Sequence, residues 1–148
     1  MRAIFGPMKK MTAEQAQAFL AFGTRTGKLA IVRKSGAPSV TPIWFVVDGD
    51  DLVFMTHESS AKAKALHRDN RAALVVDEEA PPYSFVLVEG TVALSEDRDE
   101  LLHWATVIGS RYMGPERAEE YGKRNGVPGE YVVRLTPTRI VAVSGVAD

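Results

Sequence analysis

The sequence predicts a small antiparallel β-barrel with flanking helices, in the mainly β or α+β class. About seven short segments are rich in β-branched and aromatic residues, a composition typical of strands. Most links between them are shorter than the dozen or more residues that a parallel crossover requires. The 148 residues, 45% of them hydrophobic, suit one domain with one core. We therefore expect a single domain over residues 1–148 and no doubly wound parallel sheet.

The first third of the chain is expected to hold one helix and then three strands. Residues 11–23 read as a helix, because Thr12 can cap it and Gln15 stands where a capping box requires Glu or Gln. Phe22 is assigned to its apolar face. Asp48–Asp51 contains Asp-Gly, which is typical of a tight hairpin turn. The three strands are expected to form an antiparallel meander and span residues 27–33, 38–47 and 52–56.

The remainder of the chain is expected to continue with short helices and strands. Residues 60–68 read as a helix with Ala61, Ala65 and Leu66 facing inward, since they recur at helical spacing. Gly90 indicates a bulge within a long strand, and Pro137 is expected to form a turn between the last two strands. The remaining strands are predicted at residues 72–77, 83–95, 130–135 and 138–145, and the remaining helices at 96–112 and 114–126.

Composition and charge exclude several classes of function. The formal net charge is −1, so the chain has no strong field that would attract nucleic acid or a membrane surface. The absence of cysteine excludes disulfides, thiolate catalysis and cysteine-ligated zinc. The three histidines, His57, His67 and His103, lack metal-ligand spacing. With no secretion signal and no apolar run near the ~20 residues of a membrane span, we expect a soluble, cytoplasmic protein without a bound metal.

The stretch "FMTHESSAKAKALHRDNR" places serines and lysines at the start of a helix directly after a strand. The first N–H groups of a helix lack intrahelical partners, and the helix dipole places partial positive charge there. Ser59 and Ser60 add hydroxyl groups, and Lys62 can reach back over the helix end. Together they are typical of a phosphate site. Taken alone, the stretch favours a solvated surface helix over an anion site.

The stretch "VTPIWF" is the second unusual feature. Pro42 removes a ladder donor, which indicates a sheet edge, a bulge or a backbone that faces a ligand. Trp44 follows two residues later, and a flat ring system could lie along such a backbone. The alternative is that Ile43 and Trp44 pack on the two faces of an ordinary strand.

The order of these features resembles a known family. "GKLAIVRKSGAPSVTPIWFVVDGDDLVFMTHESSAKAKALHRDNRAALVVD" and "PPYSFVLVEGTVAL" look like the split β-barrel flavin-binding proteins related to pyridoxamine-phosphate oxidase, and "TPTRIVAVSG" matches their closing strand. The chain is most similar to the actinobacterial branch that binds the deazaflavin coenzyme F420. The resemblance implies a split β-barrel, an antiparallel Greek-key barrel with flanking helices, which forms a homodimer with its sites at the interface.

The resemblance also assigns residues to the cofactor. The strand around Trp44 would place its backbone along the ring, the following strand would lie along the ribityl-like chain, and the helix start would hold the phosphate. An aromatic side chain after the double proline would reach the ring of the other subunit. In chain order, the assigned residues are Pro42, Ile43, Trp44, Phe45, Met55, Thr56, Ser60, Lys62 and Tyr83.

Two departures from the FMN-binding members favour F420. Val40 and Ala61 stand where FMN-binding oxidases of this family carry arginines, so two phosphate contacts are missing. The phosphate of F420 is a diester and carries less charge. The leading hypothesis is an oxidoreductase that transfers a hydride between bound F420 and a small organic acceptor, with the protein holding the ring. The alternatives are an FMN-binding reductase or oxidase and a non-enzymatic F420 carrier. No catalytic side chain is assigned; solvent, Tyr83 or Tyr112 could supply a proton.

Overall fold

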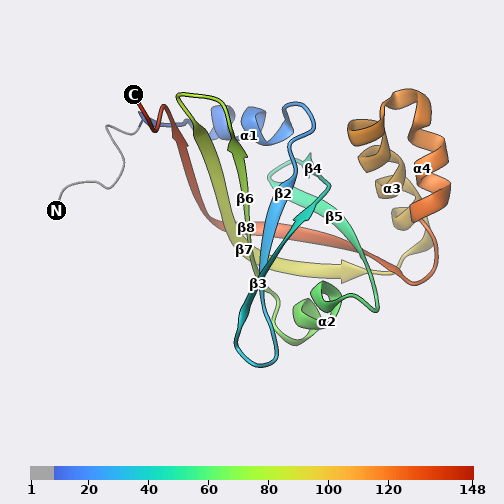
Figure 1. Ribbon diagram of the computed structural model, residues 1–148. Coiled ribbons are helices and arrows are strands. Elements are labelled where there is room, and N and C mark those ends of the chain that lie inside the picture. The colour runs from blue at the N-terminus through green and yellow to red at the C-terminus, as the bar shows by residue number, and fades with distance from the viewer. Residues whose placement is uncertain (1–8) are drawn as a thin grey trace.

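The computed structural model describes residues 9–148, and its main feature is a curled antiparallel sheet flanked by helices (Figure 1). Residues 1–8, part of the segment inspected for a secretion signal, lie outside the described residues. In chain order the elements are β1 (Lys9–Lys10), α1 (Ala13–Ala21), β2 (Gly27–Val32), β3 (Pro38–Ile43), β4 (Phe45–Asp48), β5 (Asp51–His57), α2 (Ala61–Arg68), β6 (Arg71–Glu78), β7 (Ser84–Ser95), α3 (Arg98–Met113), the 3-10 turn η1 (Pro115–Arg117), α4 (Ala118–Asn125) and β8 (Glu130–Ser144).

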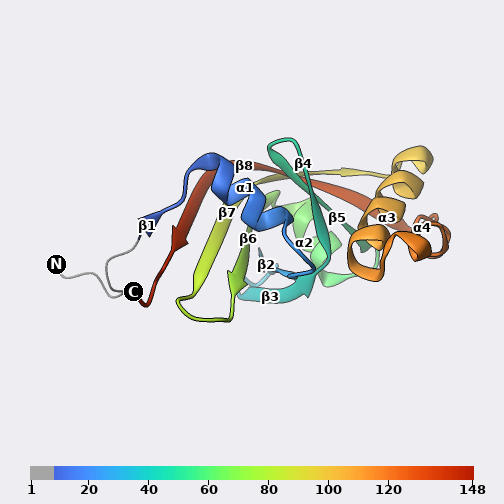
Figure 2. The ribbon, with the colours of Figure 1, turned by 90° about the horizontal axis from the view of Figure 1, so that it is seen from above.

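The sheet curls into a half-barrel that matches the predicted split β-barrel. Its strands are ordered β3-β2-β6-β7-β8-β5-β4, and β1 pairs with β8. The two outer strands of this path, β3 and β4, are consecutive in the chain. Seen from above, α1 lies along the sheet, while α3 and α4 stand together at the far end (Figure 2). The fold class predicted from the sequence is therefore confirmed.

Trp44 divides the second predicted strand into two. Residues 38–47 were expected to form one strand of a meander, but β3 pairs with β2 up to Ile43 and β4 pairs with β5 from Phe45 onward. The chain changes partner at Trp44, because its backbone leaves one edge of the curled sheet and joins the other. The continuous strand and the simple meander were wrong, whereas the hairpin at Asp48–Asp51 is present.

The predicted turn at Pro137 is also wrong. β8 runs unbroken for 15 residues, and Pro137 lies opposite Gly90 where the register shifts. A Cβ on Gly90 would lie 2.1 Å from the Thr136 carbonyl oxygen, so only glycine lets the two strands approach here. The bulge predicted at Gly90 is thus the feature that accommodates Pro137, which has no N–H to donate.

The helix starts follow the predicted capping chemistry, but two inward-facing assignments do not hold. Gln15 N–H donates to the Thr12 hydroxyl (3.1 Å), and Thr12 N–H donates to the Gln15 amide oxygen (2.9 Å), which completes the capping box. Phe22 is 66% exposed, because α1 ends at Ala21 and the chain turns extended. In α2 the buried alanines are Ala63 and Ala65, and Ala61 is exposed.

Two clusters of buried side chains stabilise the fold. The larger fills the half-barrel, and its fully buried members include Phe45, Phe54 and Leu74. The smaller lies between β4, β5, β8 and α3 and includes Val53 and Leu101. Burial of apolar surface of this kind is the main stabilising term in folding. The second cluster fixes α3 against the strands that carry the predicted site.

Candidate functional site

A cavity of about 420 Å³ lies where the β3–β4 junction, the end of β5 and the start of α2 meet α3 and α4. The two sequence features that suggested a ring wall and a phosphate site therefore border the same space. Of the nine residues assigned to the cofactor, seven line this cavity: Pro42, Ile43, Trp44, Met55, Thr56, Ser60 and Lys62.

The start of α2 forms one end of the cavity. Ser60 caps the helix by accepting a hydrogen bond from Ala63 N–H (3.0 Å), and its hydroxyl lies 2.7 Å from the Thr56 hydroxyl. The Ser60 hydroxyl oxygen accepts the Ala63 N–H, so that donor is taken. The N–H groups of Ala61 and Lys62 remain free, because at these positions of a helix they have no intrahelical partner. The Lys62 side chain adds an ammonium group to this end. These groups can bind an anion.

Ser59 does not contribute to this end as expected from the sequence. It is exposed, does not line the cavity, and its hydroxyl lies 2.7 Å from His57 Nδ1. Its N–H also donates to the same nitrogen (3.1 Å). Ser59 therefore shapes the loop around His57 and leaves the anion end to α2.

The β3–β4 junction forms another part of the cavity wall. Trp44 stacks on Tyr112 of α3 with ring centroids 5.0 Å apart and planes within 4°, and it contacts Tyr121 of α4 at 6.0 Å. Phe45 is fully buried and does not line the cavity, unlike the sequence assignment. Its N–H donates to the Tyr112 hydroxyl (3.2 Å), which itself donates to the Arg25 carbonyl oxygen (3.0 Å). Tyr112 therefore supports the wall from behind.

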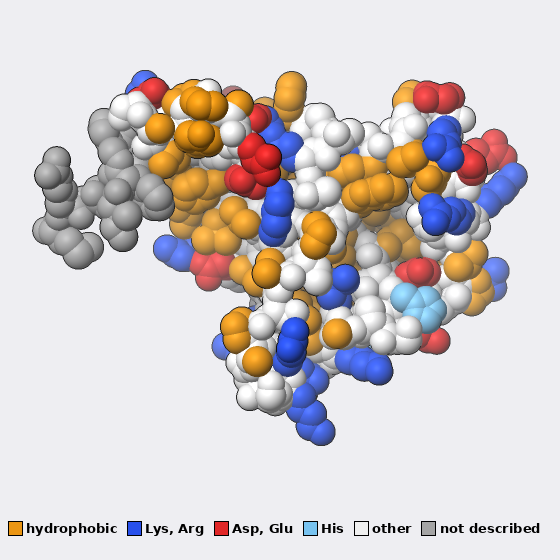
Figure 3. Space-filling view, viewed as in Figure 1, with side chains coloured by type: hydrophobic (Ala, Val, Ile, Leu, Met, Phe, Trp, Pro, Cys, Tyr) orange, Lys and Arg blue, Asp and Glu red, His pale blue; other side chains and the backbone are white. Residues whose placement is uncertain are grey.

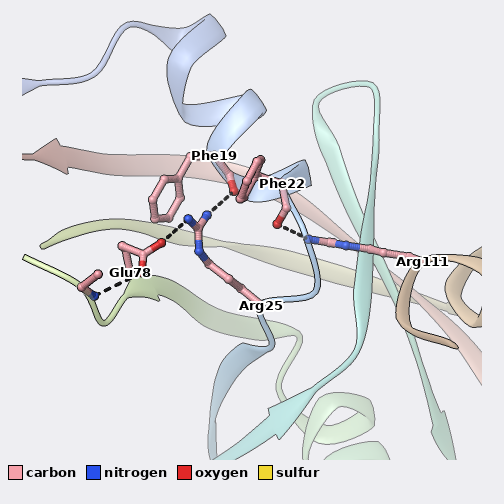
Figure 4. Close-up of polar contacts among 6 residues, drawn as sticks. Phe19, Phe22, Arg25, Glu78 and Arg111 are labelled. Atoms are coloured by element: carbon pink, nitrogen blue, oxygen red, sulfur yellow. Dashed lines mark hydrogen bonds and ion pairs between the residues drawn. The ribbon is translucent and has the colours of Figure 1, made fainter. Parts of the chain in front are cut away.

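Arg111 ties α3 to the segment around the end of α1, and its hydrogen bond to the Phe22 carbonyl oxygen (3.4 Å) is drawn in Figure 4. Its guanidinium donates to the carbonyl oxygens of Phe45 (2.6 Å), Leu20 (2.8 Å) and Gly23 (2.9 Å). Burial lowers the pKa of Arg111 from its ordinary value, because desolvation disfavours the charged form. Two of the acceptors, Leu20 in the last turn of α1 and Gly23 just after it, are carbonyl oxygens at a helix end, where such groups lack intrahelical partners. The hydrogen bonds hold α3, and with it one side of the cavity, against α1 and β4.

Arg25 makes a second link of this kind in the same region (Figure 4). Its guanidinium donates to the Phe19 carbonyl oxygen (3.2 Å) and forms an ion pair with Glu78 of β6. The hydrogen bond from Arg25 lowers the pKa of the Glu78 carboxyl. Together, Arg25 and Arg111 connect the loop after α1 to both halves of the sheet.

The remaining lining residues were not assigned from the sequence. Ala105 and Ile108 come from α3, Asn125 from the end of α4, and His57 and Glu130 from paired positions at one end of β5 and β8. Burial raises the pKa of Glu130 from its ordinary value, because desolvation disfavours the carboxylate. Except for His57, these residues are 61 or more positions from Pro42–Trp44, so no local pattern connects them with the site.

Residues 12–144 match the family model described as pyridoxamine 5'-phosphate oxidase. The chain belongs to this family. The family resemblance noted in the sequence is therefore confirmed. Members of the pyridoxamine 5'-phosphate oxidase family bind flavin-type cofactors. A search of curated proteins found no match.

Solved structures share the fold of this pyridoxamine 5'-phosphate oxidase family member. A conserved hypothetical protein of Mycobacterium tuberculosis has a TM-score of 0.78 and 24% identity over 94% of this chain and 86% of its own. An F420 reductase has a TM-score of 0.66 and 23% identity over 83% and 94%. An FAD-binding protein of Mesorhizobium loti has a TM-score of 0.70 and 17% identity over 93% and 98%. At these identities the likeness establishes the split barrel.

Tyr83, the ninth assigned residue, lies apart from the cavity. It follows the double proline between β6 and β7, is 44% exposed and has a φ of 63°. It borders a separate hollow with Asp77, Phe85 and Val146. Within one chain it does not line the cavity, so its role at the ring of a second subunit stays a prediction.

Two general expectations concern membranes and metals. Within residues 9–148, none of the helices is long and apolar enough to cross a membrane. In the same part of the chain, no three His, Asp or Glu side chains gather as they would around a metal ion.

Proposed function

We propose that this chain is an oxidoreductase that transfers a hydride between bound coenzyme F420 and a small organic acceptor. The observation that supports the proposal is the shared cavity, which is lined by Lys62 of α2 and by Pro42–Trp44 of the β3–β4 junction. Its volume of about 420 Å³ falls within the ~300–1,000 Å³ of ligand pockets. A planar ring with a phosphate-bearing tail needs both features in one space.

The chain's own residues would bind and orient this cofactor. The N–H groups of Ala61 and Lys62, with the Lys62 ammonium, would donate to the phosphate at the positive end of α2. The backbone of Pro42–Trp44 would lie along the ring, and Met55 and Thr56 along the chain that joins ring to phosphate. When bound, the deazaflavin supplies the hydride chemistry. Ile108 and Ala105 would exclude water from the far side of the cavity.

The donor set favours F420 over FMN. Lys62 is the cation among the described lining residues, and Val40 and Ala61 stand where FMN-binding members carry arginines. One lysine and a helix N-terminus suit a singly charged phosphodiester better than a doubly charged phosphomonoester. The likeness to an F420 reductase supports the same choice. An FMN-binding reductase is the second candidate, because the same wall accommodates either ring.

The proposal is tested by titrating the purified apoprotein separately with F420 and FMN, with the absorption of each cofactor as readout. We expect tighter binding of F420, followed by oxidation of reduced F420 when unsaturated carbonyl or quinone acceptors are added. Binding without turnover of any acceptor would indicate a carrier. Tighter binding of FMN would support the second candidate, and no binding of either would refute the proposal.

A further inference from the structure

Glu130 is an acidic side chain that lines the proposed cofactor cavity and has no assigned role. A carboxylate near a bound anion weakens its binding by charge repulsion, and it weakens the binding of a doubly charged anion more than that of a singly charged one. We infer that Glu130 makes the phosphate end of the cavity select a singly charged phosphodiester over a doubly charged phosphomonoester. This inference rests on the proposed function, since it concerns the same cavity.

The backbone places Glu130 at the phosphate end. Glu130 begins β8 and pairs with His57, the last residue of β5. Ser60 N–H donates to the His57 carbonyl oxygen (3.0 Å), and Glu58 N–H donates to the Gly129 carbonyl oxygen (2.8 Å). The start of β8 is therefore fastened to the loop that leads into α2. Glu130 and Lys62 both line the cavity, and the pairing of Glu130 with His57 places Glu130 beside the loop from which α2 starts.

The charges at this end nearly balance. Lys62 and Glu130 carry one positive and one negative charge, and Asn125 is neutral. His57 Nδ1 accepts a hydrogen bond from Ser59 N–H, so the neutral ring carries its proton on Nε2. What remains to attract an anion is the partial positive charge of the α2 N-terminus and its N–H donors. These groups suit a phosphate with one negative charge. A second negative charge on the phosphate would be repelled by the Glu130 carboxylate, with no further cation to offset it.

The phosphate group itself provides the contrast needed for a test. Above a second pKa of about 6, a phosphomonoester carries close to two negative charges, whereas a diester carries one. At the surface of a protein, one additional unit charge a few ångströms from a carboxylate changes binding by roughly tenfold or more. Removing the charge of Glu130 should therefore improve binding of the monoester much more than binding of the diester.

The test uses one ring with two phosphate groups. The 5'-phosphate and its methyl ester are prepared on the ring that the wild-type protein binds, deazaflavin or flavin, and dissociation constants are measured at pH 8. We expect the wild type to bind the methyl ester about tenfold more tightly. Glu130→Gln should remove most of this preference. Glu58→Gln, an exposed neighbour outside the cavity lining, is the matched control and should retain it.

The outcomes separate this inference from the proposed function. If a ring binds but the wild type shows no preference for the methyl ester, or Glu130→Gln keeps the wild-type preference, the inference is overturned and the cofactor site stands. If neither ring binds, both fail together. Thermal unfolding confirms that the variants are folded, and Glu130→Ala provides a second neutral variant should Glu130→Gln be unstable.

Discussion

Lys62 is the side chain on which the anion end of the cavity depends most. In Lys62→Ala a charge-assisted hydrogen bond to the phosphate is lost, so we expect cofactor affinity to fall by about 1.5–3 kcal/mol. The free energy of unfolding should hardly change, because single solvated lysines contribute little to it. Calorimetric or absorption titration measures the affinity. Lys64→Ala, exposed on the same helix, is the control, and equal affinities of the two variants would remove Lys62 from the site.

Asp69, the residue after α2, tests the electrostatics at the other end of that helix. Arg71 donates to its carboxylate through Nε (3.0 Å), Nη2 (2.7 Å) and the backbone N–H (3.1 Å). The side-chain hydrogen bonds from Arg71 are the main cause that lowers the pKa of Asp69 to about 2 from 3.8. Because the pKa of Asp69 is lower in the folded than in the unfolded protein, its ionised carboxylate stabilises the folded state at pH values above the unfolded pKa. That contribution is thus present above about pH 4 and lost as the pH falls toward 2.

The Asp69 prediction is measured by following its carboxyl resonance by NMR during an acid titration. In Arg71→Ala the pKa of Asp69 should rise toward 3.8. In Arg68→Ala it should rise much less, because Arg68 acts only through its charge and is the weakest of the causes. A wild-type Asp69 that titrates near its ordinary value would contradict the hydrogen-bond geometry.

At the scale of elements, Tyr112 joins α3 to the wall of the cavity. Tyr112→Phe leaves the Phe45 N–H and the Arg25 carbonyl oxygen without their hydroxyl partner. Since unsatisfied buried groups cost about 1–3 kcal/mol each, we expect unfolding at clearly lower denaturant and weaker cofactor binding. Tyr131→Phe is the control, as the Tyr131 hydroxyl has no hydrogen-bond partner among residues 9–148. Equal stability of the two variants would show that Tyr112 supports the wall by stacking on Trp44 alone.

The elements also show what the sequence could predict. Local signals were sufficient where one turn of chain decides the structure, as at the Thr12–Gln15 capping box. They failed at Trp44 and Pro137, because partner strands far away in sequence decide whether a strand breaks there. Pro137 would end an isolated strand, yet opposite Gly90 it is absorbed by a bulge.

At the scale of the whole molecule, the candidate site also contains both residues that the sequence predicted and residues that it missed. Pro42–Trp44, Ser60 and Lys62, which line the cavity, could be assigned from the sequence because they lie within short segments that carry their own chemistry. Glu130 and Asn125 were missed, because only the pairing of β8 with β5 and the packing of α4 bring them to the cavity. On the face shown in Figure 3, acidic and basic side chains are scattered among hydrophobic and uncharged ones, and this face adds no clear signal for the site.

The predicted homodimer concerns the molecule as a whole, and Tyr83 provides its test. Tyr83 lies outside its own chain's cavity, so it can act on a cofactor only across a subunit boundary. We expect light scattering to show a dimer, and we expect Lys62→Ala and Tyr83→Ala each to weaken cofactor binding. In an equal mixture of the two variants, refolded together, half of the dimers are mixed. Each mixed dimer then pairs the intact Lys62 of one chain with the intact Tyr83 of the other, so about a quarter of all sites should regain full affinity. If Tyr83 has no role across the boundary, mixing restores no site beyond those of the separate variants. A monomer in solution would remove the basis for assigning Tyr83 to the cofactor.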